Sequence, residues 1–256
     1  MSPYSSLKKI CVLAADTFSG SIKSRFFTLF FIFAFILLYS SVLGSMLSIS
    51  HEERVLADIS LLLIEILCLV YAVFQVSSAL SDEISSKSIY MVLSRPVPRY
   101  LCLIGKEIGV ILSSGFITLV LSLMAIIVIR TRGLPVPDFF FWAVAGIFTK
   151  ITIIISFSFL ISLITTTNVS TFVLSFLLYI LGHVTSQIEP LLQKAGGIKF
   201  ALLKACAIIF PNLNLYSARE IGISTCPFTA ASVSAALLWI LAAYILSAWL
   251  FSRKEF

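Results

Sequence analysis

Two ionisable residues, Glu65 and Lys150, lie inside long apolar stretches of this 256-residue sequence. A charged side chain at the centre of a bilayer costs about 3 kcal/mol on insertion scales, so it usually faces protein or water and finds a partner. The two residues could form an internal ion pair that locks two helices together. Alternatively, they could belong to a translocation path or a proton-coupled site. A proton relay usually needs more than two ionisable groups, which favours the ion pair.

The depths of these two residues are compatible with a contact between neighbouring helices. At 1.5 Å per residue, Glu65 lies about 9 Å from the start of its apolar run and Lys150 about 16 Å from the start of its own. Both side chains are long enough to bridge that difference. Gln75 is a further polar residue in the run that contains Glu65, and we expect His183 to be a polar interface residue rather than a ligand.

The sequence lacks three motifs that are typical of common classes of enzyme. It has no phosphate-binding G-x-x-x-x-G-K-[ST] loop, no H-E-x-x-H and no G-x-S-x-G, so we expect no catalytic residues and no ATP hydrolysis by that route. No C-x-x-C occurs, and we predict no metal site and no cofactor. Cys206 and Cys226 fall in one predicted external segment, where they could form a disulfide or remain two unpaired thiols.

The composition is that of an all-α polytopic membrane protein. Hydrophobic residues make up 59% of the chain and charged residues 12%, whereas about 25% of a soluble domain is charged. We predict one transmembrane domain over residues 1–256, and its net charge of +6 indicates membrane orientation and contact with anionic lipid rather than nucleic acid. A span needs about twenty residues, and six apolar runs qualify: Phe26–Leu47, Ile59–Leu80, Ile108–Ile129, Phe139–Ile164, Val169–Ile188 and Phe228–Phe251.

Residues 1–25 are expected to form an amphipathic helix that lies on the cytoplasmic leaflet. Their apolar residues recur at helical spacing, as Leu7, Cys11, Ala14, Phe18 and Ile22. The excess of Lys and Arg in the connecting segments places both termini in the cytoplasm. Arg130 and Arg132, in a predicted outer loop, are the main conflict with that orientation.

The segment 189–227 is too short for a domain and too apolar for a plain loop. Its run Phe200–Phe210 is below spanning length and is followed by Pro211, so we expect short re-entrant or interfacial helices. We predict that this segment forms a lid over the outer end of the bundle, with Phe210, Pro211 and Asn212 at an outer gate.

A charged segment, Ser81–Lys106, separates the second and third predicted spans. Asp82 and Glu83 suit the N-terminus of a short amphipathic helix, and Pro96 and Pro98 would end it. This element is either a docking surface at the cytoplasmic mouth of the bundle or a basic loop that only sets orientation.

The residues of this segment resemble the first cytoplasmic loop of the type-2 ATP-binding-cassette (ABC) permeases. The likeness rests on Asp82-Glu83, Ser88, the corner Leu93-Ser94-Arg95-Pro96, Arg99 and Gly105-Lys106, and one departure is Lys87, where the family usually has Gly. Phe210-Pro211-Asn212-Leu213 also resembles the Pro-Asn segment that these permeases carry before the last span.

The resemblance implies the permease subunit of an exporter in a bacterial inner membrane. Two such subunits, identical or different, would pair with two separate ATPase subunits, which would hold ATP and Mg. The helix Asp82–Ser94 would then be a coupling helix that docks on the ATPase. Its implied docking residues are Asp82, Glu83, Lys87, Ser88, Met91 and Arg95.

A second hypothesis is a secondary transporter driven by an ion gradient, or a membrane scaffold. Glu65 and Lys150 are its best support. Secondary transporters commonly contain internal repeats with broken helices, and no such repeat is visible in this sequence. The substrate cannot be derived from these residues, although the many Phe side chains in the spans would suit an amphipathic cargo as well as ordinary packing.

Overall fold

The chain folds into an all-α bundle that contains six helices long and apolar enough to cross a membrane. The computed structural model describes residues 3–45, 52–81, 99–165, 167–192, 210–217 and 230–253, and every regular element in these ranges is helical. The six long helices are α2 (Arg25–Ser45), α3 (Glu52–Val76), α6 (Arg99–Thr131), α7 (Phe139–Ile164), α8 (Asn168–Leu192) and α11 (Ala230–Arg253). The prediction of a polytopic α-helical membrane protein is therefore confirmed.

Two helices begin well before the apolar runs that predicted them. The helix α7 has the bounds expected from its apolar run, but α3 begins at Glu52 rather than Ile59, and α6 begins at Arg99 rather than Ile108. An apolar run marks the part of a helix that lies in lipid, whereas the helix itself continues through polar residues at its ends. As a result, Lys106 and Glu107 belong to a spanning helix and are buried.

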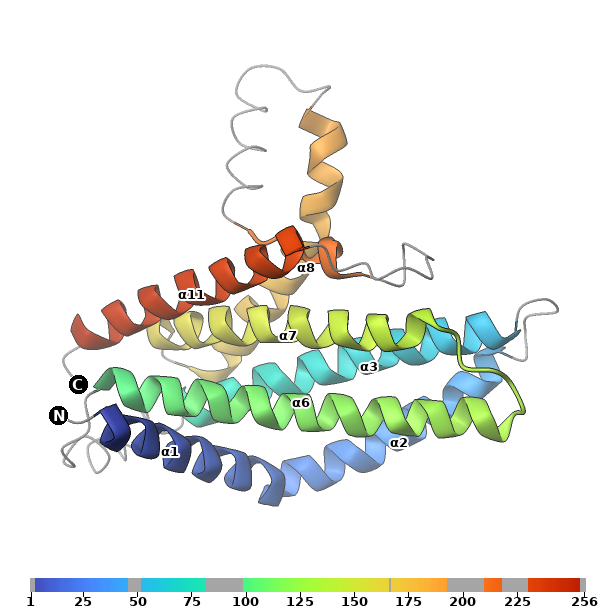
Figure 1. Ribbon diagram of the computed structural model, residues 1–256, viewed down its shortest axis with the longest axis horizontal. Coiled ribbons are helices and arrows are strands. Elements are labelled where there is room, and N and C mark those ends of the chain that lie inside the picture. The colour runs from blue at the N-terminus through green and yellow to red at the C-terminus, as the bar shows by residue number, and fades with distance from the viewer. Residues whose placement is uncertain are drawn as a thin grey trace.

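The helices α3, α6 and α7 pack against one another at the centre of the bundle. Figure 1 shows α3 beside α6 and α7, with α11 over α7, and the N and C marks at the same end of the bundle. The chain passes from α6 to α7 at the opposite end through residues 132–138, where Gly133 has φ 72°.

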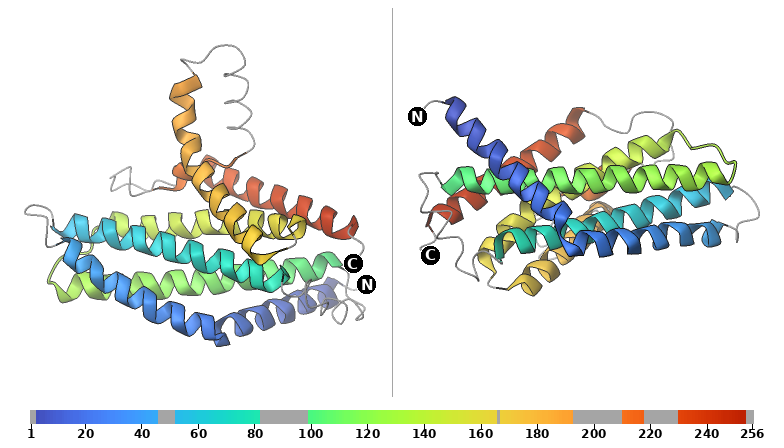
Figure 2. Two further views of the ribbon diagram at one scale, coloured as in Figure 1. Left: turned by 180° about the vertical axis from the view of Figure 1, so that it is seen from behind. Right: turned by 90° about the horizontal axis from the view of Figure 1, so that it is seen from below.

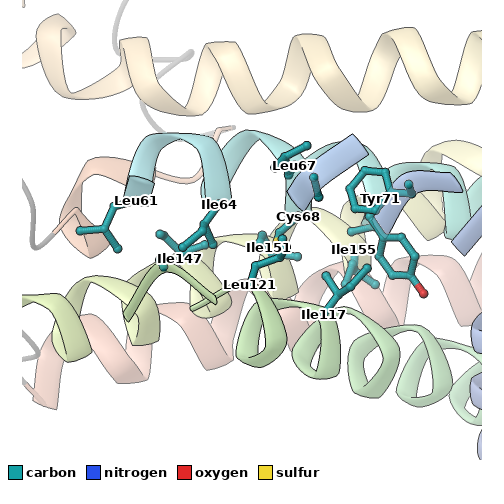
Figure 3. Packing of buried hydrophobic residues seen from close by; sticks show 14 of the residues in the cluster. Leu61, Ile64, Leu67, Cys68, Tyr71, Ile117, Leu121, Ile147, Ile151 and Ile155 are labelled. Carbon is teal, nitrogen blue, oxygen red and sulfur yellow. The ribbon is translucent and has the colours of Figure 1, made fainter. Parts of the chain in front are cut away.

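The core lies between α3, α6 and α7. Figure 3 shows side chains of these three helices meeting, and nearly all of them are fully buried. From α3 come Ile64, Cys68 and Tyr71. They meet Ile117 and Leu121 of α6 and Ile147, Ile151 and Ile155 of α7. The helix α2 also contributes to this core through Ala34 and Leu38. All six spanning helices carry exposed large apolar side chains as well, as expected for surfaces that face lipid.

The N-terminal helix α1 (Pro3–Lys23) is formed as predicted, and it packs on the first half of α6. At two positions the helices approach closely. A Cβ built on Gly105 would lie 2.6 Å from the Cβ of Leu13, and one built on Gly109 would lie 2.6 Å from the Cβ of Thr17. The residues of the predicted apolar stripe do not share one environment, because Ala14 is buried and Cys11 is exposed.

A short break separates α1 from α2. Ser24 lies between them, and its hydroxyl accepts a hydrogen bond from the amide of Phe27 at 3.1 Å and donates to the carbonyl of Ser21 at 2.8 Å. A serine in this role satisfies one of the free amides at a helix start. The bend between the two helices (Figure 2) directs α1 across α6 while α2 runs along α3.

The end of α3 changes from α-helix to a π-helical turn, η1 (Ser77–Ser81). Such turns within helices are rare and often lie at functional sites. The Nζ of Lys106 on α6 donates a hydrogen bond to the carbonyl oxygen of Ala79 in this turn, at 3.0 Å. The last turn of α3 and the second turn of α6 are thereby joined directly.

Candidate functional site

Glu65 is the centre of a polar cluster within the bundle. Its Oε1 lies 2.7 Å from the Nζ of Lys150, so the predicted contact between these residues is confirmed as a salt bridge. The hydroxyl of Tyr179 donates to the same oxygen at 2.8 Å, and the Nε2 of His183 lies 3.5 Å from it. The cluster thus gathers a carboxylate, an ammonium, a phenol and an imidazole.

Three helices position these groups. Glu65 comes from α3, Lys150 from α7, and both Tyr179 and His183 from α8. Tyr179 and His183 are four residues apart, so they lie on one face of α8, and their rings are 4.4 Å apart between centroids. At 1.5 Å per residue, Glu65 lies about 20 Å along α3 and Lys150 about 16 Å along α7. Counted from the starts of the helices, the two residues therefore differ in depth by about 4 Å, compared with about 7 Å expected from the apolar runs.

The cluster is mostly shielded from solvent and lipid. The side chain of Lys150 is 3% exposed, that of Glu65 14% and that of His183 28%. Lys150 also lies 3.4 Å from the Nε2 of His183. An isolated charge here would be costly, and the direct contact between opposite charges offsets part of that cost.

A cavity of about 270 Å³ lies beside the cluster. Its polar wall is formed by Glu65, Lys150, Tyr179, His183, Tyr216 and Ser217. Its apolar wall comes from α3, α7 and α8, and includes Ala143 and Ile147, both nearly fully buried. Sequence analysis therefore paired only Glu65 and Lys150, two of the six polar residues that line this cavity.

The turn of 3₁₀-helix η2 (Leu213–Tyr216) closes one side of this cavity. Asn212 caps it by accepting a hydrogen bond from the amide of Asn214 at 3.1 Å, and Asn214 donates its side-chain amide to the carbonyl of His183 at 3.2 Å. Tyr216 donates its hydroxyl to the carbonyl of Ser232 on α11 at 3.0 Å. Burial raises the pKa of the Tyr216 phenol, which keeps it in its neutral, donating form.

The predicted gate residues Phe210, Pro211 and Asn212 lie directly before η2. Their role as a gate remains a prediction. Pro211 is buried, Phe210 is partly buried in a cluster with Leu213, and Asn212 caps η2. A Cβ on Gly182 of α8 would lie 2.7 Å from the Cδ1 of Leu213, so this glycine lets η2 approach α8 closely. The other residues of the predicted lid, 193–209 and 218–229, lie outside the described residues.

Gln75 does not join the cluster. It lies ten residues further along α3, about 15 Å away, where its amide donates to the hydroxyl of Tyr71 at 3.0 Å. A second buried carboxyl, Glu107 on α6, accepts a hydrogen bond from Ser156 of α7 at 2.5 Å. Sequence analysis missed Glu107 because the third span was started at Ile108.

Tyr179 and His183 are the functional candidates whose role the sequence did not predict. His183 was expected only as an interface residue, and Tyr179 was not singled out. Their i, i+4 spacing within one span is the signal that could have paired them. It remained ambiguous because tyrosine and histidine in spans often serve only in packing or as interface anchors.

The implied docking residues Asp82, Glu83, Lys87, Ser88, Met91 and Arg95 lie outside the described residues, as do Cys206 and Cys226. Within the described ranges, Cys11, Cys68 and Cys102 form no disulfide. These ranges also contain no group of three or more His, Cys, Asp or Glu side chains that could hold a metal ion.

A scan against models of protein families finds no match to this chain, and a search of curated proteins finds no significant match. The site is therefore interpreted from its own geometry.

Proposed function

We propose that this chain is the membrane-spanning permease subunit of an exporter, and that a separate subunit hydrolyses the ATP. The proposal combines the resemblance of residues 81–106 to the coupling loop of type-2 ABC permeases with a membrane domain of six spans. In this account two permease subunits, identical or different, pair with two ATPases in a bacterial inner membrane, and both termini of the chain are cytoplasmic.

The observation that carries the proposal is the bond from Lys106 to the carbonyl of Ala79. These two residues lie on the helices that lead into and out of residues 82–98. Because the two helices are joined at this point, a force on the intervening segment would move them together rather than separate them. Rigid movement of packed helices is a common way to transmit a conformational change.

The helix α3 links this junction to the polar cluster. Ala79 and Glu65 are fourteen residues apart along α3 and η1, about 21 Å, and the side chains of α3 between them include Cys68, Tyr71 and Val76, all fully buried. A closely packed helix of this kind moves as a unit. An ATPase that displaced the loop would therefore shift Glu65 relative to Tyr179 and His183 on α8.

Co-purification tests the proposal. The tagged chain is isolated from native membranes in mild detergent, and a co-purifying protein that binds labelled ATP is sought. We expect such a partner in near-stoichiometric amount, and we expect Met91→Arg or Glu83→Arg to remove it. The control Arg132→Glu changes an exposed charge at the opposite end of the bundle and should retain the partner.

The variants must elute and unfold like the unmodified chain for this comparison to count. A partner that stays bound to the Met91→Arg variant would reject residues 82–98 as the docking segment. A folded preparation without any ATP-binding partner would reject the exporter function itself.

A carrier driven by an ion gradient is the second candidate. It is favoured by the convergence of Tyr179 and His183 on Glu65 and Lys150, because this gives more proton-binding groups than the sequence suggested. Its test is proton movement into vesicles that contain the purified chain and no ATP, driven by an imposed pH gradient. Movement that Glu65→Gln abolishes would support the carrier, and vesicles that show none would reject it.

A further inference from the structure

We propose that the cavity beside Glu65 binds the head group of an amphiphile that carries an ammonium, with the apolar tail lying across α3 and α8 in the bilayer. Such a site would bind its ligand with or without an ATPase partner, so the inference does not depend on the exporter proposal. It follows from four features of the cavity: a carboxylate oxygen with no donor among the described residues, a shielded cation, aromatic walls and an apolar rim.

The first feature is the second oxygen of Glu65. Lys150, Tyr179 and His183 all approach Oε1, and within the described part of the chain Oε2 has no hydrogen-bond donor. Glu65 lines the cavity and is partly exposed there. A carboxylate oxygen in this position can accept a charge-assisted hydrogen bond from a ligand.

The second feature is the sign of the charge that a ligand in the cavity would meet. Lys150 is almost completely buried, and its ammonium is already in contact with Glu65 and His183. It is therefore poorly placed to receive an anionic head group. The group that the cavity presents to a ligand is the carboxylate, which selects a cation.

The third feature is the set of aromatic side chains. Phe176, Tyr179 and Tyr216 line the cavity together with Glu65. The face of an aromatic ring attracts an ammonium through its negative quadrupole, and aromatic cages are used to bind quaternary ammonium groups. At about 270 Å³ the cavity is slightly smaller than a site for a drug-sized molecule, so it suits a head group rather than a whole lipid.

The fourth feature is the exposed rim of the cavity. Leu62 and Ile66 of α3 and Phe176 of α8 line it, and all three are exposed on spanning helices. Figure 2 shows α8 running obliquely across α3, so the rim lies where these two helices meet. An apolar tail leaving the cavity on this side would stay in the hydrocarbon of the bilayer.

Equilibrium binding of radiolabelled dodecylamine to the full chain in nanodiscs tests this proposal. We expect one saturable site, and we expect dodecyltrimethylammonium to compete while dodecyl sulfate at the same concentration does not. Glu65→Gln should weaken binding by about tenfold or more, because a charge-assisted hydrogen bond is lost. The matched control is Glu107→Gln, which changes another buried carboxyl outside the cavity and should bind normally.

Glu65→Gln removes the negative charge that Lys150 contacts, and this variant could fold poorly for that reason. Two further variants allow the proposal to be tested in that case. Glu65→Gln/Lys150→Met removes both charges, and we expect it to fold but to lose selectivity for the amine. Phe176→Ala leaves the ion pair intact and should weaken binding, whereas Phe141→Ala, at an exposed position on α7 outside the cavity, should not. Equal binding of amine and sulfate, or unchanged affinity in Glu65→Gln and in Phe176→Ala, would overturn the proposal.

The lipid composition of the nanodiscs identifies the source of the ammonium. Competition that grows with the fraction of phosphatidylethanolamine would support a membrane lipid as the natural ligand. Saturable, amine-selective binding that is independent of this fraction would support a free amphiphilic amine.

Discussion

The Nζ of Lys106 lies 3.0 Å from the carbonyl oxygen of Ala79, and this contact joins α6 to the π-helical turn that ends α3. The two residues are 27 positions apart in the sequence, and Lys106 is buried. A buried lysine that donates to a backbone carbonyl replaces a hydrogen bond that a regular α-helix would otherwise make.

Replacing this lysine should loosen the junction. We expect Lys106→Met to lower the free energy of unfolding by about 1–3 kcal/mol, because the carbonyl of Ala79 loses a charged donor. Thermal unfolding in detergent measures the change. Arg130→Met, at an exposed position near the other end of α6, is the control and should change stability by less than about 0.5 kcal/mol. Equal unfolding temperatures for both variants would contradict the structural role of Lys106.

The ion pair between Glu65 and Lys150 should show strong coupling between its two residues. Glu65→Gln or Lys150→Met alone leaves a mostly buried charge without the opposite charge that it contacts, and should cost about 3–5 kcal/mol. The double variant removes both charges and should recover most of that stability, which a double-mutant cycle of unfolding free energies would measure. Additive losses in the cycle would mean that the contact contributes nothing to the fold.

The close approach of α1 to α6 should depend on Gly109. A Cβ at this position would lie 2.6 Å from the Cβ of Thr17 and 2.9 Å from the carbonyl oxygen of Ala14, so Gly109→Ala should destabilise the protein by about 1–3 kcal/mol. Gly20→Ala is the matched control, because a Cβ there meets nothing within 4 Å. It should stabilise the helix by up to about 1 kcal/mol. A Gly109→Ala variant as stable as the unmodified chain would show that α1 is not held at this contact.

Tyr216 should make the stability depend on pH only in the alkaline range. Burial raises the pKa of Tyr216 in the folded state. The contribution of Tyr216 to the free energy of unfolding is therefore fully present below the pKa that tyrosine has in the unfolded chain, and it is lost as the pH rises through the pKa of the folded state. At pH 7, Tyr216→Phe should cost about 1 kcal/mol through loss of the hydrogen bond to Ser232. Above about pH 10, the difference between the two proteins should shrink. A difference that is constant from pH 7 to 11 would contradict a buried neutral phenol.

The sequence predicts the spans better than it predicts their ends. The helix α7 begins and ends on apolar residues, Phe139 and Ile164, so its bounds follow directly from hydropathy. The helix α6 begins with Arg99 and carries Lys106 and Glu107, and their charges hid the start of the helix. The burial of Lys106 and Glu107 depends on contacts with Ala79 and Ser156, which are distant in the sequence.

The candidate site was predictable only in part for a similar reason. A charge in an apolar run needs a partner, and this argument alone brought Glu65 and Lys150 together. Tyr179, His183 and Tyr216 carry no such penalty, so nothing in their sequence context required them to face the pair. Their place in the site results from the oblique packing of α8 and from the η2 turn, which only the tertiary structure provides.

Site-specific photocrosslinking tests the central claim, that residues 82–98 dock on a separate ATPase, most directly. A photoreactive benzophenone amino acid is placed at Met91 in one sample and at Leu123, an exposed position on the spanning helix α6, in another. After irradiation of native membranes, the adducts are probed with labelled ATP. We predict an ATP-binding adduct from Met91 and none from Leu123. The absence of an ATP-binding adduct at Met91, or equal adducts from both positions, would contradict the account.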